Sequence, residues 1–374
     1  MTSWAAAMAD CPPSWPGGNT HAPGEVLLRV APTSTIDEVL SRLNQTYPGT
    51  TALAASASRG IYQVNVPIGT LECDVLDTML TTMVFDPNAP DPNDPLLWAE
   101  LNYESESAEG STGSIYISNQ LPTAAQFYQQ QYAVQMLGMT AAQQSATGRG
   151  VAVAVLDTGV DAAHSALQGA VLPGYNFVAD TPDTSESADG VDNDGDGMFD
   201  EMFGHGTFNA GLIHLTAPDA KILPIVVLND DGVGETFDII RGIYFAIDHG
   251  VEVINMSFGS SEWSEGLSEA LEEARQHGIL VVASAGNDNR KEPPRMPATS
   301  GDAIGVTAVD DHDVRAPFSN YHDDVFLSAP GATAKLPNGE PDPNRAVYSI
   351  VPGEGYASWE GTSLAAAFTS GTAA

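Results

Sequence analysis

Three polar residues of this 374-residue chain stand in stretches whose composition suits nucleophilic catalysis. Ser363 follows Gly361 and Thr362 and precedes a run of small apolar residues, which predicts a turn that places the serine at the start of a helix. His205 stands between two glycines ahead of an apolar helical pattern, and Asp157 follows a short apolar run typical of a buried strand. A serine hydroxyl is a weak nucleophile near neutral pH, so it needs a base and a third group that orients the base. The chain offers all three groups.

The chemistry gives each of these residues a role. We expect Asp157 to accept a hydrogen bond from one ring nitrogen of His205 and so to fix the tautomer whose other nitrogen takes the proton of Ser363. His205 would then donate that proton to the leaving amine as a general acid. Each stretch alone also fits a structural role, such as a helix-capping aspartate, a structural histidine or a serine that caps a helix.

The order Asp157, His205, Ser363, with the surroundings Asp-Thr-Gly, Gly-His-Gly-Thr and Gly-Thr-Ser, resembles the subtilisin-like serine proteases, or subtilases. The resemblance runs from roughly residue 130 to the end of the chain. It implies a secreted serine endopeptidase that hydrolyses peptide bonds of polypeptide substrates through an acyl-enzyme intermediate. The alternative is an inactive subtilase-like binding protein, a pseudoprotease, and a calcium-dependent adhesion module is a third reading that does not explain the triad.

The resemblance also implies residues that bind the substrate. Asn287 follows the apolar run 279–283 and matches the asparagine whose amide joins the Ser363 backbone N–H in stabilising the oxyanion. A turn asparagine with positive φ is the alternative. Because one wall of the first specificity pocket would be made of small residues, we expect an apolar or aromatic residue before the cleaved bond. The two expected walls are Ser257, Phe258 and Gly259 on one side, and Ala283, Ser284, Ala285 and Gly286 on the other.

Acidic residues recur at alternate positions between residues 189 and 201. Asp192, Asp194 and Asp196, followed by Asp200, imitate the start of an EF-hand loop and suit Ca²⁺, which prefers oxygen ligands. Position twelve of that template is Phe203 rather than glutamate, so we expect a calcium loop of the subtilase kind instead of an EF-hand. A solvated acidic turn is the alternative.

The overall charge excludes several functions. With 13 Lys+Arg against 49 Asp+Glu, the net charge is -36, which repels phosphate backbones, so we expect no nucleic-acid partner. No apolar run reaches about 18 residues, so we expect no membrane span. Only Cys11 and Cys73 are present, so we expect no disulfide framework. The first residues form no intact signal peptide, so a secreted or cell-envelope location would require an export signal upstream or a different start.

The chain divides into four regions by pattern. We expect a disordered tail (1–23), a small α+β domain (24–103), an exposed linker rich in Ser, Glu and Gly (104–125), and an α/β catalytic domain (126–374) with a parallel sheet covered by helices on both faces. The catalytic domain is expected to be incomplete, because the chain ends inside the helix that Ser363 should begin.

The α+β domain, by its position and its ending Ala99–Tyr103, resembles the inhibitory propeptide of subtilases. The resemblance implies an intramolecular inhibitor that adds its last strand to the substrate cleft, and an unrelated accessory domain is the alternative. We expect self-cleavage between Tyr103 and Gln126. Strands are predicted over 25–30, 61–66, 97–103, 222–228, 251–256, 279–284 and 304–309, and helices over 34–43, 71–83, 126–146, 236–249 and 265–276.

Overall fold

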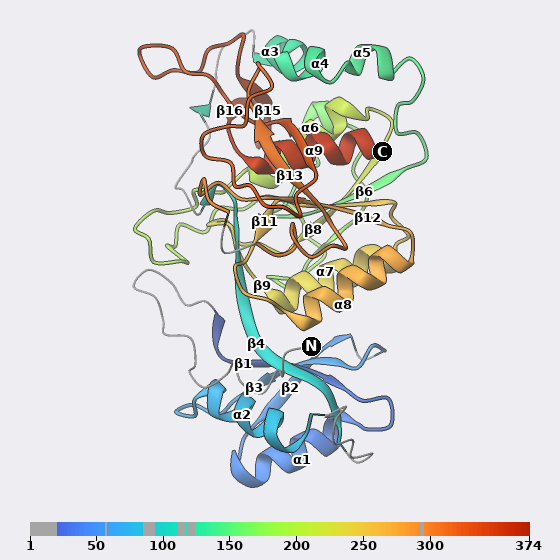
Figure 1. Cartoon of the computed structure of the whole chain (residues 1–374), viewed down its shortest axis with the longest axis vertical. Helices are drawn as coiled ribbons and strands as arrows, with labels where there is room; N and C mark the ends of the chain where they lie inside the picture. Colours follow the sequence, from blue (N-terminus) through green and yellow to red (C-terminus); the bar gives the residue numbers. More distant parts are fainter. Residues whose placement is uncertain (1–20, 57, 85–93, 111–116, 119–123, 292–294) are drawn as a thin grey trace. The chain divides into compact units, whose positions relative to one another are not determined.

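The computed structural model describes residues 21–56, 58–84, 94–110, 117–118, 124–291 and 295–374. They form two compact units, whose elements are labelled in Figure 1. The smaller unit contains the described part of residues 1–104 together with residues 235–241 and 264–269. The larger unit contains the described parts of residues 105–234, 242–263 and 270–374.

The smaller unit is an antiparallel sheet with two helices, which confirms the predicted α+β region. Strand order is β4-β1-β3-β2. The helices bury their apolar stripes, including Val39 and Leu43 on one helix and Val75 and Met79 on the other, in a single cluster with the sheet. The elements are β1 (His21–Val30), α1 (Ile36–Thr46), β2 (Thr51–Ser56), β3 (Ile61–Asn65), α2 (Glu72–Thr82) and β4 (Leu96–Ser107).

Two boundaries of this region differ from the sequence prediction. β1 begins at His21, inside the predicted tail, because His21 pairs with Tyr103 in the sheet and lies 3.0 Å from the Glu72 carboxylate. β4 continues to Ser107, inside the predicted linker, because its end finds a second strand partner. Residues 1–20, 111–116 and 119–123 lie outside the described residues. Cys73 is disulfide-bonded, although the sequence led us to expect no disulfide framework.

The larger unit is built on a seven-stranded parallel sheet in the order β14-β13-β12-β10-β6-β8-β7. The parallel sheet confirms the prediction from alternating apolar runs and helical patterns, but that pattern did not give the strand order. Strands β7 and β14 were not predicted, because they are too short to show a pattern. The strands are β6 (Ala152–Asp157), β7 (Tyr175–Asn176), β8 (Lys221–Val226), β10 (Val253–Met256), β12 (Leu280–Ser284), β13 (Ile304–Val309) and β14 (Leu327–Pro330).

Helices cover both faces of this sheet, with α6 and α9 on one side and α7 and α8 on the other (Figure 1). The helix predicted over 126–146 is instead three short helices, because Gln131 leaves the helical conformation (φ -57°, ψ 158°) and Gly138 has φ 62°. The remaining elements are α3 (Ala124–Gln130), α4 (Tyr132–Met136), α5 (Met139–Ala142), η3 (Ser165–Leu167), α6 (His205–Thr216), α7 (Thr236–Asp248), α8 (Glu265–Gln276), α9 (Thr362–Ala373), β5 (Ile117–Ser118), β9 (Val233–Glu235), β11 (Phe258–Gly259), β15 (Val347–Val351) and β16 (Gly355–Trp359).

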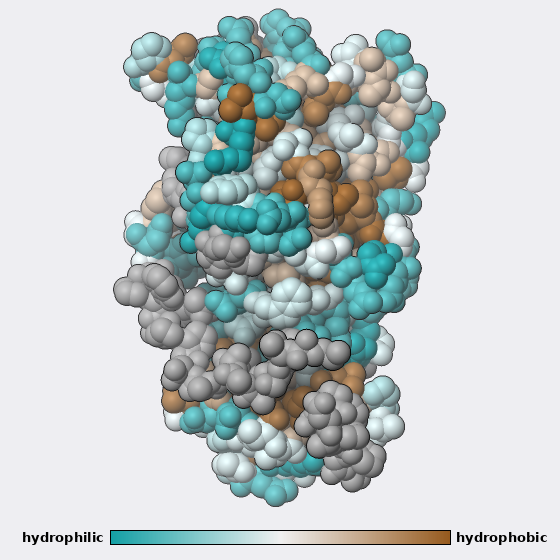
Figure 2. Space-filling view, in the orientation of Figure 1, coloured by the Kyte–Doolittle hydropathy of each residue, from teal (hydrophilic) through white to brown (hydrophobic). Residues whose placement is uncertain are grey.

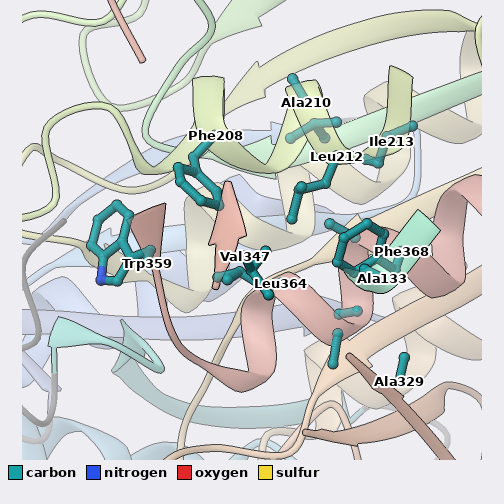
Figure 3. Packing of buried hydrophobic residues seen from close by; sticks show 14 of the residues in the cluster. Ala133, Phe208, Ala210, Leu212, Ile213, Ala329, Val347, Trp359, Leu364 and Phe368 are labelled. Atoms are coloured by element: carbon teal, nitrogen blue, oxygen red, sulfur yellow. The ribbon is translucent and has the colours of Figure 1, made fainter. Parts of the chain in front are cut away.

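Helices α6 and α9 form the centre of the core. Both are apolar on most sides, which is the pattern of a buried helix. The Phe208 and Trp359 rings meet edge to face with centroids 5.7 Å apart, near Leu364 and Phe368 (Figure 3). Close packing leaves no room for a side chain at Gly211, whose added Cβ would lie 2.3 Å from Ser349 Oγ. Helices α6 and α9, whose first turns contain His205 and Ser363, are therefore closely packed in the core.

The visible surface is largely hydrophilic, as the charge of the chain requires (Figure 2). Brown, apolar residues form small separate patches on this face. Among the described residues, no helix combines the length and apolar character that crossing a bilayer needs.

Candidate active site

The three predicted catalytic residues lie at the ends of elements that meet at one edge of the parallel sheet. Asp157 is the last residue of β6, and Ser257 directly follows the neighbouring strand β10. In open α/β sheets, ligands bind at the carboxyl ends of neighbouring strands whose following connections leave in opposite directions. β6 and β10 form such a pair. His205 and Ser363 stand in the first turns of α6 and α9. Gly204 precedes His205 with φ 94°, a conformation that favours glycine.

The acid and the imidazole are hydrogen-bonded as predicted. His205 Nδ1 lies 2.7 Å from Asp157 Oδ1, and the His205 side chain is fully buried. The other ring nitrogen, Nε2, lies 2.9 Å from Glu109 Oε2, and Ser363 Oγ donates to the same oxygen at 2.5 Å. The His205 ring and the Ser363 hydroxyl thus contact the same carboxylate oxygen. The sequence did not indicate Glu109, because it lies in the predicted linker and belongs to no motif.

The two carboxylates determine the protonation of the imidazole. Burial alone would lower the pKa of His205, but the charge and hydrogen bond of Asp157, followed by those of Glu109, outweigh burial and raise this pKa to about 10. The described structure therefore contains an imidazolium at neutral pH. A histidine in this state cannot accept a proton, so catalysis by His205 requires Glu109 to leave.

Residues behind the histidine hold Asp157 and the start of α6. Asn209, one turn along α6 from His205, donates from Nδ2 to Asp157 Oδ2 at 3.0 Å. The buried carboxylate of Glu186 accepts from the Thr158 hydroxyl at 3.1 Å and from the backbone N–H groups of Gly204 at 3.0 Å and of Thr207 at 2.9 Å. Burial raises the pKa of Glu186 to about 7, against the opposing effect of these donors. No sequence pattern indicated Glu186, whereas Asn209 could have been placed by its helical spacing from His205.

Asn287 directs its amide toward the nucleophile. Its Nδ2 donates to the Ala108 carbonyl oxygen at 3.0 Å and to Glu109 Oε1 at 3.3 Å, while the Ser363 backbone N–H lies 3.4 Å from the same Oε1. Asn287 Oδ1 accepts from the Thr362 N–H and hydroxyl, both at 3.0 Å, which orients the amide. The two predicted oxyanion donors therefore point at one position.

The expected cleft residues lie around this centre and are all buried. β11 pairs antiparallel with the end of β4, so that Phe258 faces Ser107 and Gly259 faces Glu106. A strand is therefore added where a substrate strand was expected. The sequence did not indicate Arg295, whose Nη1 donates to the Gly259 carbonyl at 3.4 Å. The residues of the two expected walls are Ser257, Phe258, Gly259, Ala283, Ser284, Ala285 and Gly286.

The predicted calcium ligands fall into two groups, not one. Carboxylate oxygens of Asp192, Asp194 and Asp196 lie within 4.8 Å of one another. Asp200 was predicted with them, but the structure places it in a second group with Asp189 and Asp230. The prediction failed here because the loop folds back: the N–H groups of Asp189 and Gly190 both donate to Asp200 Oδ1 at 2.9 Å.

A buried carboxylate supports a cation at this loop. Neither carboxylate oxygen of Glu201, a residue only 6% exposed, has a hydrogen-bond partner among the described residues. Burial and then the charges of Asp231, Asp194 and Asp196 raise the pKa of Glu201 to about 7. An orphaned buried carboxylate beside three others, with oxygen donors only, fits Ca²⁺. Glu201 and Asp231 were not among the predicted ligands.

Comparisons with known proteins identify the family of this chain. The sequence profile of the subtilase family matches residues 148–374. An intracellular serine protease of Paenibacillus polymyxa is 36% identical over 254 residues, which cover 64% of this chain and 71% of that protein. Thermitase of Thermoactinomyces vulgaris is 34% identical over 252 residues, which cover 67% of this chain and 84% of thermitase.

Similarity in structure extends farther along the chain. The chain is similar to the crystal structure of fervidolysin from Fervidobacterium pennivorans, a keratinolytic enzyme related to subtilisin, with a TM-score of 0.68. The match covers 94% of this chain and 54% of the fervidolysin chain. At 24% sequence identity this likeness shows the fold alone. The family match and the two relatives carry the classification: the chain is a member of the subtilase family of serine endopeptidases.

Proposed function

We propose that this chain hydrolyses peptide bonds of polypeptides through a Ser363-His205-Asp157 triad and an acyl-enzyme intermediate. The observation that carries the proposal is that His205, whose Nδ1 lies 2.7 Å from Asp157, and the Ser363 hydroxyl both contact one buried oxygen, Oε2 of Glu109. With Glu109 displaced, His205 Nε2 takes the proton of Ser363 Oγ as that oxygen attacks the substrate carbonyl. The proton then passes to the leaving amine, and water attacks the acyl-enzyme by the same route.

Asn287 and the Ser363 N–H would stabilise the oxyanion of each tetrahedral intermediate. Support comes from their common target, because both already donate toward one carboxylate oxygen of Glu109. Removal of one such donor typically costs about 2.7 to 4 kcal/mol in the transition state. Asn320, for which the sequence analysis predicted no role, holds this loop by donating from Nδ2 to the Ala285 carbonyl at 3.1 Å.

The proposal includes inhibition by the chain's own N-terminal region. Pairing of the end of β4 with β11 supports it, because a peptide that adds a strand to the cleft denies that edge to a substrate. Processing within the predicted interval from Tyr103 to Gln126 would release the inhibitor. We predict a secreted or cell-envelope location. Because one similar protease is named as intracellular, cell fractionation is the experiment that tests this prediction.

Calcium would be held by the acidic loop ahead of α6. Asp192, Asp194 and Asp196 with Glu201 would supply its oxygen ligands, and the orphaned Glu201 carboxylate carries this assignment. The ion would neutralise the loop and so fix the approach to His205, but it takes no part in bond breaking. Isothermal titration of the chain with Ca²⁺ tests the site directly, and an absence of binding at millimolar Ca²⁺ contradicts it.

Labelling with a fluorophosphonate probe tests the triad, because the probe reacts only with an activated serine. We expect the chain to become labelled after processing, and the S363A variant to remain unlabelled. Absence of labelling in a folded, processed chain would instead support the alternative of an inactive binding protein.

A peptide library tests the pocket. The predicted apolar or aromatic preference before the cleaved bond would be contradicted by enrichment of acidic residues, which would point to the Arg295 guanidinium beside Gly259.

A further inference from the structure

We propose that the chain cleaves itself at the Ala108–Glu109 peptide bond, and that the Glu109 side chain slows this cleavage by binding the catalytic base and nucleophile. The proposal rests on the proposed function and sharpens it. The predicted interval for processing, from Tyr103 to Gln126, contains 23 peptide bonds, whereas the contacts of the site select one of them.

The bond is selected by the position of its carbonyl group. In the ladder between β4 and β11, Ser107 faces Phe258, so the next residue, Ala108, lies opposite Ser257. Ser363 Oγ lies 3.0 Å from the Ser257 carbonyl oxygen, which places the nucleophile at this end of the ladder. The Ala108 carbonyl oxygen accepts the Asn287 amide at 3.0 Å. Ala108 therefore presents its carbonyl carbon where an oxyanion donor and the nucleophile converge.

The chain turns directly after this bond. The Gly110 N–H donates to the Ser107 hydroxyl at 3.0 Å, which closes a short turn that contains Ala108 and Glu109. This turn directs the Glu109 side chain back into the site, where it is fully buried. Space for it depends on Gly361, because a Cβ at that position would lie 1.5 Å from Glu109 Oε1. The site thus accommodates this carboxylate closely.

The contacts of Glu109 occupy every group that the cleavage needs. Oε2 accepts the proton-bearing Ser363 Oγ at 2.5 Å and lies 2.9 Å from His205 Nε2. Oε1 faces the Asn287 amide at 3.3 Å and the Ser363 N–H at 3.4 Å. A carboxylate in this position imitates a bound product. It also stabilises the imidazolium form of His205, jointly with Asp157 on β6. The next carboxylate, behind Asp157, is that of Glu186. The base is therefore unavailable while Glu109 stays in place.

Cleavage follows when the side chain swings out and His205 Nε2, no longer paired with Glu109, gives its proton to water. Ser363 Oγ forms a bond to the Ala108 carbonyl carbon, and its proton passes to His205 Nε2 and then to the Glu109 nitrogen as the C–N bond breaks. Water hydrolyses the Ala108 ester and frees Ser363. Glu109 becomes the new N-terminus, and its side chain is no longer fixed beside His205, so the brake acts only before the first cut.

The test compares the full chain with its E109Q variant, which keeps the shape of the side chain and removes its charge. We measure the first-order loss of the uncut chain between pH 6 and 10, and determine the N-terminus of the product. Glu109 should be the new N-terminus. At pH 7 the E109Q variant should cut itself about tenfold faster or more, because its base is no longer paired with a second carboxylate. The rate of the wild-type chain should rise toward pH 10, and that of E109Q should level off at lower pH.

Two controls keep the outcomes separate. E340Q alters an exposed carboxylate far along the sequence and should match the wild-type rate, and S363A should remain uncut. A product that begins at another residue, or equal rates for E109Q and the wild type, overturns the proposal even when the processed chain reacts with fluorophosphonate. If no form of the folded chain reacts with the probe or cuts itself, the proposed function fails, and this inference fails with it.

Discussion

The catalytic centre and the acidic loop ahead of α6 both gather carboxylates, but only the catalytic centre contains its own cation. At the centre, Asp157 and Glu109 share the buried His205 imidazolium. In the loop, no Lys, Arg or His among the described residues forms an ion pair with the carboxylates, which are Asp189, Asp192, Asp194, Asp196, Asp200, Glu201, Asp230 and Asp231.

The two regions obtain their stability in different ways. Like charges held close together destabilise a fold unless a partner offsets them, and burial makes the imbalance costlier. In the catalytic centre the partner that offsets the negative charges is the His205 side chain, which the proposed reaction also uses. The loop meets this condition only in part, with backbone donors such as the Asn193 N–H, which lies 2.5 Å from Asp231 Oδ2. We therefore expect an external cation in the loop and not in the centre.

Removing the charge of Asp157 should cause the largest change, a loss of self-cleavage rate at the catalytic centre. In the D157N variant the amide no longer orients His205 or stabilises its charged form, so we expect self-cleavage to slow by about 10⁴-fold. Densitometry of the uncut chain over days measures this rate, with circular dichroism to show an intact fold. The D219N variant, whose exposed carboxylate pairs with Arg149, is the control. A loss of less than tenfold would mean that Asp157 is not the partner on which the base depends.

The pH dependence of stability due to Glu186 tests whether the negative charges at the catalytic centre are fully offset. Its pKa of about 7 in the folded state lies above its ordinary value of 4.5, so the folded chain binds more protons than the unfolded chain between these values. The stability that protonated Glu186 provides is therefore complete below pH 4.5 and is lost as the pH rises through 7. Relative to E186Q, the wild type should lose roughly 3 kcal/mol of unfolding free energy from pH 4.5 to pH 8.

Urea unfolding of both chains in the S363A background, which prevents self-digestion, measures this difference. A constant difference at all pH values would show that the donors from Thr158, Gly204 and Thr207 keep Glu186 ionised throughout. The E340Q variant, which alters an exposed carboxylate, should show no such pH dependence.

Calcium should decide the stability of the loop. At a Ca²⁺ concentration about 100 times the dissociation constant, binding should add about 2.7 kcal/mol, and chelation should lower Tm by roughly 5 to 10 °C. The E201Q variant should weaken this response. It removes an orphaned buried charge, so it should unfold at a higher temperature than the wild type in EDTA, yet gain less from Ca²⁺. Thermal unfolding of S363A chains measures both effects, and equal gains from Ca²⁺ would remove Glu201 from the site.

The sequence predicted the parts of the site that lie inside short local motifs. Asp157, His205 and Ser363 each stand in a frame of small residues at the end of a regular element, so both the residue and its element were visible. Glu109 lies in a segment without periodicity, and it reaches the site only because β4 pairs with β11. A tertiary contact of this kind leaves no trace in spacing or composition.

The same reason explains the calcium loop. Alternating aspartates marked the segment, but its folding back on itself separates Asp200 from Asp194, and this reversal depends on backbone donors that no pattern reveals. Asp230 and Asp231 could have been included, because they follow β8, the neighbour of β6, at the same edge of the sheet. The parallel sheet itself was predictable from its apolar runs, whereas the order of its strands depends on packing across the whole unit.

The smallest change in self-cleavage rate should come from replacing Asn209, which donates a hydrogen bond to the second carboxylate oxygen of Asp157. The N209A variant removes the 3.0 Å hydrogen bond to Oδ2 and leaves the His205 bond to Oδ1 in place. We expect self-cleavage to slow roughly fivefold, about 1 kcal/mol, because one donor of several is lost. The N209D variant should slow it more, since it places a second negative charge beside Asp157. If Asn209 only fills space, both variants should alter stability and leave the proton signal of His205 Nδ1–H unchanged, so a shift of that signal in step with the rate shows that Asn209 acts through Asp157 on the base.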